Sequence, residues 1–201
     1  MTEDRDDVPA LVQAAIGHAQ FASIHAFTDG NGRIGRALVS AVLRRRDVTR
    51  NAVVPLASGL LARRDDYFAA LGSYRLGDPE PLVLLFARSA RVAATASRAT
   101  IARLNAMPAE WRAELRPRTG SVAALIIDAF YDHPVMAVHE INEAAGGANT
   151  SQTYRVIDQL TKAGFIVEIT GRKKDRVWAA SEVMAELDDL DRRIQDAMRS
   201  E

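Results

Sequence analysis

Residues 25–36 read His-Ala-Phe-Thr-Asp-Gly-Asn-Gly-Arg-Ile-Gly-Arg, and this stretch separates two helical patterns. Before it, apolar residues recur at intervals of three and four from about Val8 to Ile24, as on an amphipathic helix. After it, a second such pattern runs from about Arg33 to Arg46. The stretch therefore predicts a glycine-containing loop that joins two helices and opens the second one.

The segment Gly30–Gly35 also satisfies the spacing G-x-G-x-x-G. In dinucleotide-binding proteins this spacing follows a strand, within a strand–helix–strand unit. Here helical patterns lie on both sides of the glycines, so the sequence disfavours a dinucleotide site. A plain glycine turn between two helices, with solvated arginines, is the simplest alternative.

The loop concentrates groups that suit phosphate chemistry. A glycine-rich loop at a helix N-terminus exposes backbone N–H groups that bind anions, and Arg33 and Arg36 add charge-assisted hydrogen bonds. An acid beside such a site, here Asp29, indicates a ligand for Mg²⁺. His25 is the side chain in the loop that exchanges a proton near neutral pH. Together these groups predict phosphoryl or nucleotidyl transfer.

The stretch resembles the active-site motif of the Fic family, H-P-F-x-[DE]-G-N-G-R-x-x-R, and eight of its nine fixed positions are present. The departure is Ala26, which stands where the motif has proline. Without the proline ring the backbone is less restricted, so we expect a looser loop. Fic proteins typically transfer AMP from ATP to a hydroxyl of a target protein. The resemblance implies AMPylation of a Ser, Thr or Tyr, with ATP as substrate and Mg²⁺ as cofactor.

The resemblance also implies a role for each matching residue. His25 would deprotonate the target hydroxyl, Asp29 would hold Mg²⁺, and Phe27 would anchor the loop in the core. The nucleotide-binding residues, three that cradle the α- and β-phosphates and two that bind the outer phosphates, would be Gly30, Asn31, Gly32, Arg33 and Arg36. Only 24 residues precede His25, so we expect the family's upstream β-hairpin flap to be missing.

Charge and turn residues divide the chain. Residues 118–148 carry a net negative charge and residues 149–180 a net positive one. Between the helical first part and these blocks, Pro, Gly and Ser at 116–121 interrupt the helical periodicity. We expect a mainly α fold with three parts: a Fic-type helical bundle at 1–116, a small α+β winged helix-turn-helix domain at 117–180 and a C-terminal helix at 181–201.

Periodicity predicts the elements of these parts. In the first part, further helices are expected at 58–72, 82–106 and 109–115. In the second part, the expected elements are helices at 121–131, 138–145 and 149–162, and then strands at 165–169 and 176–180. This order of three helices and a basic hairpin resembles the winged helix-turn-helix of bacterial proteins.

The winged-helix resemblance implies candidate DNA contacts. Residues at the start of the third helix would enter a major groove, and cations on the hairpin would meet phosphates. The residues concerned are Thr150, Ser151, Gln152 and Arg155 on the helix and Arg172, Lys173, Lys174 and Arg176 on the hairpin. A module for protein interaction or dimerisation is the alternative for this domain.

Composition excludes several other classes. The 201 residues contain no cysteine, which excludes disulfides, cysteine-ligated zinc and a thiol nucleophile. The 26 basic side chains equal the 26 acidic ones, so the chain is not a basic nucleic-acid coat. The sequence shows neither a secretory signal nor an apolar run of membrane-spanning length, so we expect no membrane contact and a cytoplasmic location.

Two alternatives to AMPylation stay open. One alternative is a transferase for another phosphate-containing group. The other is a DNA-binding transcriptional regulator whose Fic pocket senses a nucleotide and has weak or no catalytic activity. The expected partners are ATP, a hydroxyl-bearing target protein and DNA. The last helix is a candidate for homodimerisation.

Overall fold

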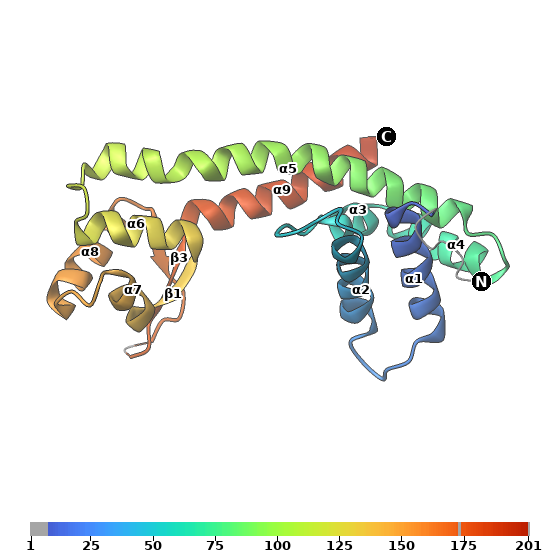
Figure 1. Ribbon diagram of the computed structural model, residues 1–201, viewed down its shortest axis with the longest axis horizontal. Helices are drawn as coiled ribbons and strands as arrows, with labels where there is room; N and C mark the ends of the chain where they lie inside the picture. The colour runs from blue at the N-terminus through green and yellow to red at the C-terminus, as the bar shows by residue number, and fades with distance from the viewer. Residues whose placement is uncertain (1–7, 173, 201) are drawn as a thin grey trace. The chain divides into compact units, whose positions relative to one another are not determined.

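The computed structural model describes residues 8–172 and 174–200 and is mainly helical, with one small sheet (Figure 1). Its elements are α1 (Ala10–Ile24), α2 (Asn31–Arg45), α3 (Leu56–Ala62), α4 (Arg64–Arg75), α5 (Glu80–Leu115), α6 (Val122–Asp132), β1 (Val135–Ala137), α7 (Val138–Ala144), α8 (Thr150–Lys162), β2 (Ile166–Glu168), β3 (Val177–Ala180) and α9 (Ser181–Ser200). The expected fold class is confirmed. None of the described helices is long and apolar enough to cross a membrane.

The chain forms two compact units. The first unit runs to Ser97 and resumes at Asp191, and the second unit is Arg98–Leu190. The division falls inside α5 and inside α9, whereas the sequence placed the boundaries at residues 116 and 180.

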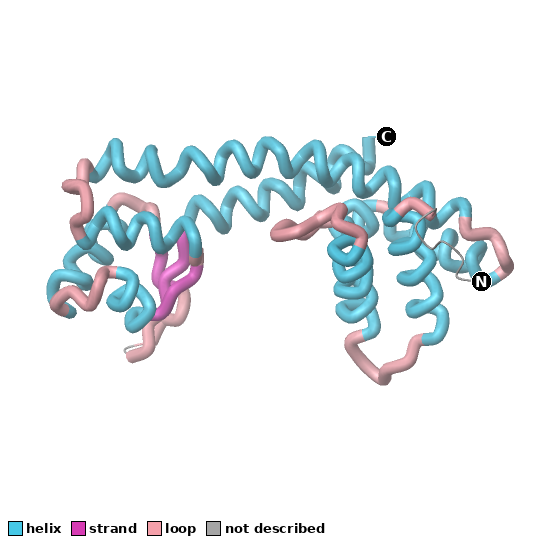
Figure 2. The backbone as a smooth tube through the Cα atoms, in the orientation of Figure 1, coloured by secondary structure: helices cyan, strands magenta, loops and turns pink. Residues whose placement is uncertain are grey.

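In the first unit, α1 and α2 pack against each other as a helical hairpin, and Figure 2 shows their connecting loop in pink. Small side chains on α1 allow the close approach, and Gly35 of α2 faces α1 so closely that a Cβ there would lie 3.1 Å from the His18 ring. The core of this unit consists of Ala14, Ala15, Ala19, Val39, Leu43, Leu56, Ala70, Leu71, Leu82 and Phe86. The hairpin thus holds both ends of the motif loop on packed helices.

Two predictions of helix bounds between residues 56 and 115 were wrong. The single helix expected at 58–72 is divided, because Arg63 leaves the helical region at φ −119° and ψ 45° and separates α3 from α4. The break expected near Pro108 is absent, and α5 continues through this proline. Met107 and Trp111 on either side of it are buried in the core of the second unit, and this packing offsets the hydrogen bond that proline removes.

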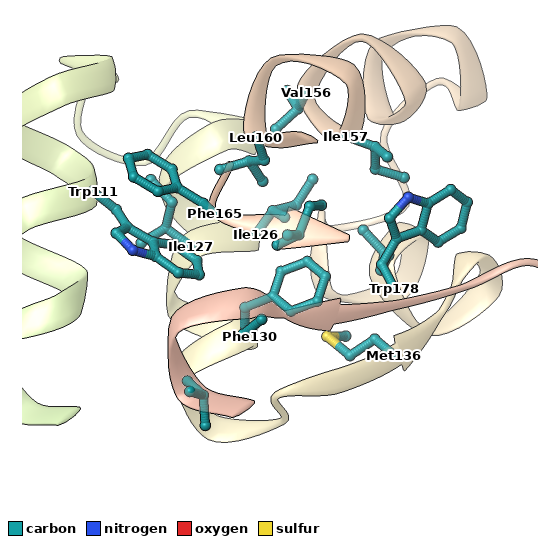
Figure 3. Packing of buried hydrophobic residues seen from close by; sticks show 14 of the residues in the cluster. Trp111, Ile126, Ile127, Phe130, Met136, Val156, Ile157, Leu160, Phe165 and Trp178 are labelled. Atoms are coloured by element: carbon teal, nitrogen blue, oxygen red, sulfur yellow. The ribbon is translucent and has the colours of Figure 1, made fainter. Parts of the chain in front are cut away.

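The second unit surrounds a three-stranded antiparallel sheet with the order β1-β3-β2. Trp178 of β3 pairs with Met136 of β1 and with Glu168 of β2. Figure 3 shows the core, where Trp111 and Phe165 stack with ring centroids 4.8 Å apart. The two strands of the hairpin were expected from the sequence, and β1 was not. At three residues, β1 is too short to show a period.

Helix α8 begins and ends as the sequence predicts. The Asn149 side chain caps it by accepting a hydrogen bond from the Ser151 N–H at 2.9 Å, and Gly164 follows its end with a φ of 80°. Its buried face consists of Thr153, Val156, Ile157 and Leu160. The opposite face of α8 is therefore left to solvent.

Gly59 marks a close contact of α3 with α5 that a larger residue cannot keep. A Cβ at Gly59 would lie 2.9 Å from both Cβ and Oγ of Ser89, so Gly59→Ala should lower the free energy of unfolding by about 1–3 kcal/mol. Gly72 of α4 is the matched control, because a Cβ there meets nothing within 4 Å. Gly72→Ala should instead stabilise by about 0.5–1 kcal/mol. Urea unfolding of both variants checks this, and equal effects would contradict it.

Candidate active site

The motif loop leaves α1 at His25, which adopts the left-handed conformation with φ 51° and ψ 54°. The His25 N–H still donates to the Phe21 carbonyl at 3.0 Å, so the residue is tied to the last turn of α1. Its side chain is exposed. The loop returns to helix at Gly30, whose φ of 82° is one that glycine adopts at little cost.

Asn31, the first residue of α2, holds the loop closed. Its buried amide makes two hydrogen bonds with the backbone of Phe27: Oδ1 accepts from the N–H at 3.1 Å, and Nδ2 donates to the carbonyl at 2.5 Å. These bonds fix the amide orientation, which leaves Nδ2 3.4 Å from His25 Nδ1. Asn31 therefore orders the loop around the imidazole.

Phe27 does not anchor the loop in the core, contrary to the expectation. Phe27 is 49% exposed, and its ring centroid lies 6.2 Å from that of Phe21 on α1. The two Asn31 hydrogen bonds hold the backbone of Phe27 instead. The anchor is thus polar, and Asn31 rather than Phe27 provides it.

A cleft of about 530 Å³ opens beside the loop. Four motif residues line one wall, His25, Asn31, Gly32 and Arg36, and residues of α3 and α4 line the other. The second wall adds two arginines, Arg64 and Arg75. None of the described residues that line the cleft is acidic, so the charge of the cleft favours an anionic ligand. Its volume lies in the range of small-molecule binding sites.

The first turn of α2 faces this loop with unpaired backbone donors. Hydrogen bonding within the helix starts with the Ile34 N–H, which donates to the Gly30 carbonyl at 3.0 Å. The N–H groups of Asn31, Gly32 and Arg33 therefore have no partner inside the helix, as at every helix N-terminus. Together with Arg36 they form an arrangement that binds phosphate oxygens.

The remaining motif residues lie outside the lining of the cleft. Asp29 accepts from the Gly30 N–H at 2.6 Å and lies 3.4 Å from Arg33, and both charged side chains are largely exposed. The Gly30 N–H, expected to bind phosphate, thus donates to Asp29 in this structure. The structure brings together four of the seven residues expected to act on the nucleotide and its target, and leaves Asp29, Gly30 and Arg33 beside them.

His18 lies behind the cleft wall as a packed histidine. It is 5% exposed, and its Nε2 lies 2.9 Å from the Tyr67 hydroxyl. Burial lowers the pKa of His18 from 6.5; a backbone contact with Gly35 opposes this, and the charge of Arg36 adds to it. His18 is therefore neutral at pH 7.5, and the positive charge of the cleft comes from its arginines.

This shift predicts a pH dependence of stability. Below pH 6.5 the unfolded chain binds a proton at residue 18 that the folded chain does not, so stability falls as the pH decreases from 6.5 towards the lowered pKa. Urea unfolding at pH 7.5 and pH 5.5 should show that the free energy of unfolding falls more between these pH values in the natural chain than in His18→Gln. Equal losses in the two proteins would contradict it.

Comparison with known proteins assigns the motif. Residues 1–43 match the model of the Fic/DOC family. This segment belongs to the Fic/DOC family. The family expected from the motif is confirmed.

Named proteins are similar to part of this chain. Over 88 residues the chain is 33% identical to "Protein adenylyltransferase Fic" of Nematostella vectensis. The matched stretch is 44% of this chain and 19% of the relative. It is 32% identical over 81 residues to "Protein adenylyltransferase fic-1" of Caenorhabditis elegans, and this stretch is 40% of this chain and 15% of the relative. The chain thus spans less than a fifth of the length of these relatives.

A solved structure of a Fic family protein from Desulfovibrio desulfuricans G20 is also similar. It matches with a TM-score of 0.42 and 21% sequence identity, over 88% of this chain and 51% of the other.

The Fic motif contains one residue suited to Mg²⁺. The described residues hold no group of three or more His, Asp or Glu that would bind a metal alone. Asp29 is a single exposed carboxylate beside the first turn of α2. Mg²⁺ binds in this way at nucleotide sites, through one or two carboxylates plus substrate phosphates. Asp29 therefore fits a metal that arrives with a nucleotide, once its ion pair with Arg33 opens.

In the second unit, most of the predicted DNA-contact residues lie on the surface. Those of α8 and the hairpin that are exposed are Thr150, Ser151, Gln152, Arg155, Arg172 and Lys174. Lys173 lies outside the described residues. Arg176 differs from the expectation, because its guanidinium lies over the Trp178 ring, 4.8 Å from the centroid. This cation–π contact holds it against the sheet.

The sequence did not single out the second wall of the cleft. Arg64, Tyr67, Phe68 and Arg75 follow the motif by about thirty residues or more, and no pattern in the sequence sets them apart. Their one shared signal is spacing, because they lie three, four and seven residues apart on α4 and hence near one face of that helix.

Proposed function

We propose that the chain is a protein adenylyltransferase, which transfers AMP from ATP to a Ser, Thr or Tyr hydroxyl of a target protein. The observation that carries this proposal is the cleft in which His25 meets Asn31, Gly32 and Arg36. A proton acceptor stands there beside backbone and guanidinium donors for phosphate. The names of two proteins that are similar to part of this chain support the same activity.

The proposed step is a substitution at the α-phosphorus of ATP. The target oxygen forms a bond to this phosphorus, the bond from phosphorus to the bridging oxygen of the β-phosphate breaks, and pyrophosphate leaves. His25 takes the hydroxyl proton. Asn31 Nδ2 donates towards His25 Nδ1, so this contact favours the His25 tautomer that carries its proton on Nε2. For Nε2 to accept the hydroxyl proton, the imidazole proton must first move from Nε2 to Nδ1. Because His25 is exposed, exchange with water permits this.

The other residues stabilise the phosphates. Arg36 and the free N–H groups at the start of α2 neutralise the charge that develops on the phosphate oxygens. Arg33 lies three residues before Arg36 on α2 and would reach the outer phosphates after releasing Asp29. Asp29 would hold Mg²⁺, which would supply positive charge to neutralise the phosphates.

Product analysis tests this proposal. The purified chain is incubated with Mg²⁺, ATP and a protein extract as acceptor, and peptides are then searched for adenylylated Ser, Thr and Tyr. Parallel reactions with GTP, UTP and CTP test the alternative of another transferred group. Adenylylated peptides with released pyrophosphate are expected, and modification by a different nucleotide alone would overturn the choice of AMP.

A second function is proposed for the second unit, that of a winged-helix DNA-binding module. The observation that favours it is the exposed face of α8, where the described structure gives Gln152, Arg155 and Gln159 no side-chain hydrogen bond. Such groups suit base edges in a major groove, and Arg172 and Lys174 suit phosphates. Fluorescence anisotropy with duplex DNA tests it: binding should weaken with salt and with Arg155→Ala, and insensitivity to both would overturn it.

We also propose that the chain forms a homodimer through α9. Analytical ultracentrifugation of the full chain tests it. A single species at the monomer mass across the concentration range would overturn it.

A further inference from the structure

The outer face of the small sheet in the second unit is apolar. Side chains alternate between the two faces of a strand, so the register of β1, β3 and β2 decides which residues share a face. One face lies in the core, and Figure 3 shows its residues Met136 and Trp178 there. The outer face consists of Val135, Ala137, Val167, Ile169, Val177 and Ala179. None of these six described residues is polar.

The larger side chains of the outer face are exposed. Val135 is 46%, Val167 is 47% and Ile169 is 54% exposed. The smaller Ala179 pairs with both valines and is buried between them. An antiparallel sheet that covers a core commonly turns polar side chains to the solvent on its other face. Apolar side chains that adjoin one another on a surface, rather than standing singly, mark interaction sites. The outer face therefore has the composition of a surface that another protein covers.

Charge favours a second copy of the chain on this face. The six residues are uncharged, so two identical faces meet without placing like charges opposite each other. At the hairpin end of the sheet, the exposed cations Arg172 and Lys174 outnumber the exposed acid Asp175. The exposed Asp132 precedes β1 at the opposite end.

A two-fold axis between the sheets, perpendicular to the strands, brings the hairpin end of one copy over the Asp132 end of the other. This arrangement pairs opposite charges at both rims of the contact. The rim of an interface stays accessible to solvent, so the hairpin cations are not buried by it.

We propose that the outer face of the sheet is a dimerisation surface, on which the same face of a second copy packs. The face measures roughly 10 by 10 Å, from a strand spacing of about 4.8 Å and a rise of about 3.4 Å per residue. A standard interface buries about 800 Å² on each partner, so the two sheets form the centre of the contact and the dimer dissociates on dilution. None of the six residues belongs to α9, so this surface differs from the α9 contact named above.

Analytical ultracentrifugation of the full chain tests this surface. The natural chain should sediment as monomer and dimer, with a dimer fraction that rises with concentration. Val167→Glu brings a carboxylate from each copy into the apolar contact, so it should raise the dimer dissociation constant about tenfold or more. Ile169→Glu should act in the same way. Both side chains are half exposed, and urea unfolding checks that each variant is folded.

Val48→Glu is the matched control, because Val48 is a 60% exposed valine in the loop after α2 of the first unit. It should leave the dissociation constant unchanged. Leu187→Glu changes an exposed residue of α9 and separates the two contacts. A dimer that is weakened by Leu187→Glu and by neither sheet variant would overturn the sheet surface. A natural chain that stays at the monomer mass across the concentration range would overturn it as well.

Discussion

Replacing His25 with alanine should abolish AMP transfer while ATP still binds. In the proposed reaction the imidazole, which lines the cleft, accepts the hydroxyl proton, and loss of general base catalysis costs about 10²–10⁴-fold in rate. The His25 side chain is exposed, so we expect the fold and the phosphate-binding groups of α2 to be kept when it is removed. Transfer is measured as AMP incorporated into protein, and ATP affinity is measured by calorimetry.

The control is His139→Ala, because His139 is an exposed histidine of α7 in the second unit. It should leave transfer and ATP affinity unchanged. Transfer by His25→Ala at the rate of the natural chain would show that His25 is not the base. Loss of ATP binding together with transfer would show that His25 binds the nucleotide rather than activates the hydroxyl.

Asn31→Ala should have the second largest effect on transfer. The change removes both hydrogen bonds to the Phe27 backbone and the contact with His25, so the loop no longer holds the imidazole in one place. Misplacement of a reacting group by about 1 Å costs on the order of 10²-fold in rate. We expect about that loss in transfer, and a loss of about 1–3 kcal/mol in unfolding free energy from the buried backbone groups left unpaired.

Asn51→Ala is the matched control, because Asn51 is an exposed asparagine in the loop between α2 and α3. It should change neither the rate nor the stability. If Asn31→Ala transferred AMP as fast as the natural chain, the polar anchor of the loop would have no part in catalysis.

Local patterns carried much of the fold. The helix expected at about Val8–Ile24 is α1 at Ala10–Ile24, and the capping residues near Asn149 mark the start of α8. These features depend on residues close in sequence. Where a contact from elsewhere in the chain decides the outcome, the prediction failed: Pro108 stays helical because its neighbours are buried in the second unit, and β1 exists because β3 pairs with it.

The same distinction applies to the candidate site. The residues of one wall follow one another in the motif, so the sequence predicted them together. The cleft residues of α4, Arg64, Tyr67, Phe68 and Arg75, reach the cleft only because α4 packs beside α1. The hydrogen bonds between Tyr67 and His18 and between Tyr74 and Gln20 show this packing. The anchor of the loop was assigned to Phe27 because an aromatic residue usually packs inside. The structure gives this part to Asn31, whose amide matches the backbone groups that the turn leaves unpaired.

The transfer of AMP is tested most directly by the position of a label. The full chain and His25→Ala are each incubated with Mg²⁺, a protein extract and ATP that carries radioactive phosphorus at either the α or the γ position. We expect the natural chain to place α-label on protein and no γ-label, and His25→Ala to place neither. Label on protein from the γ position, or α-label that is independent of His25, would contradict AMP transfer by this cleft.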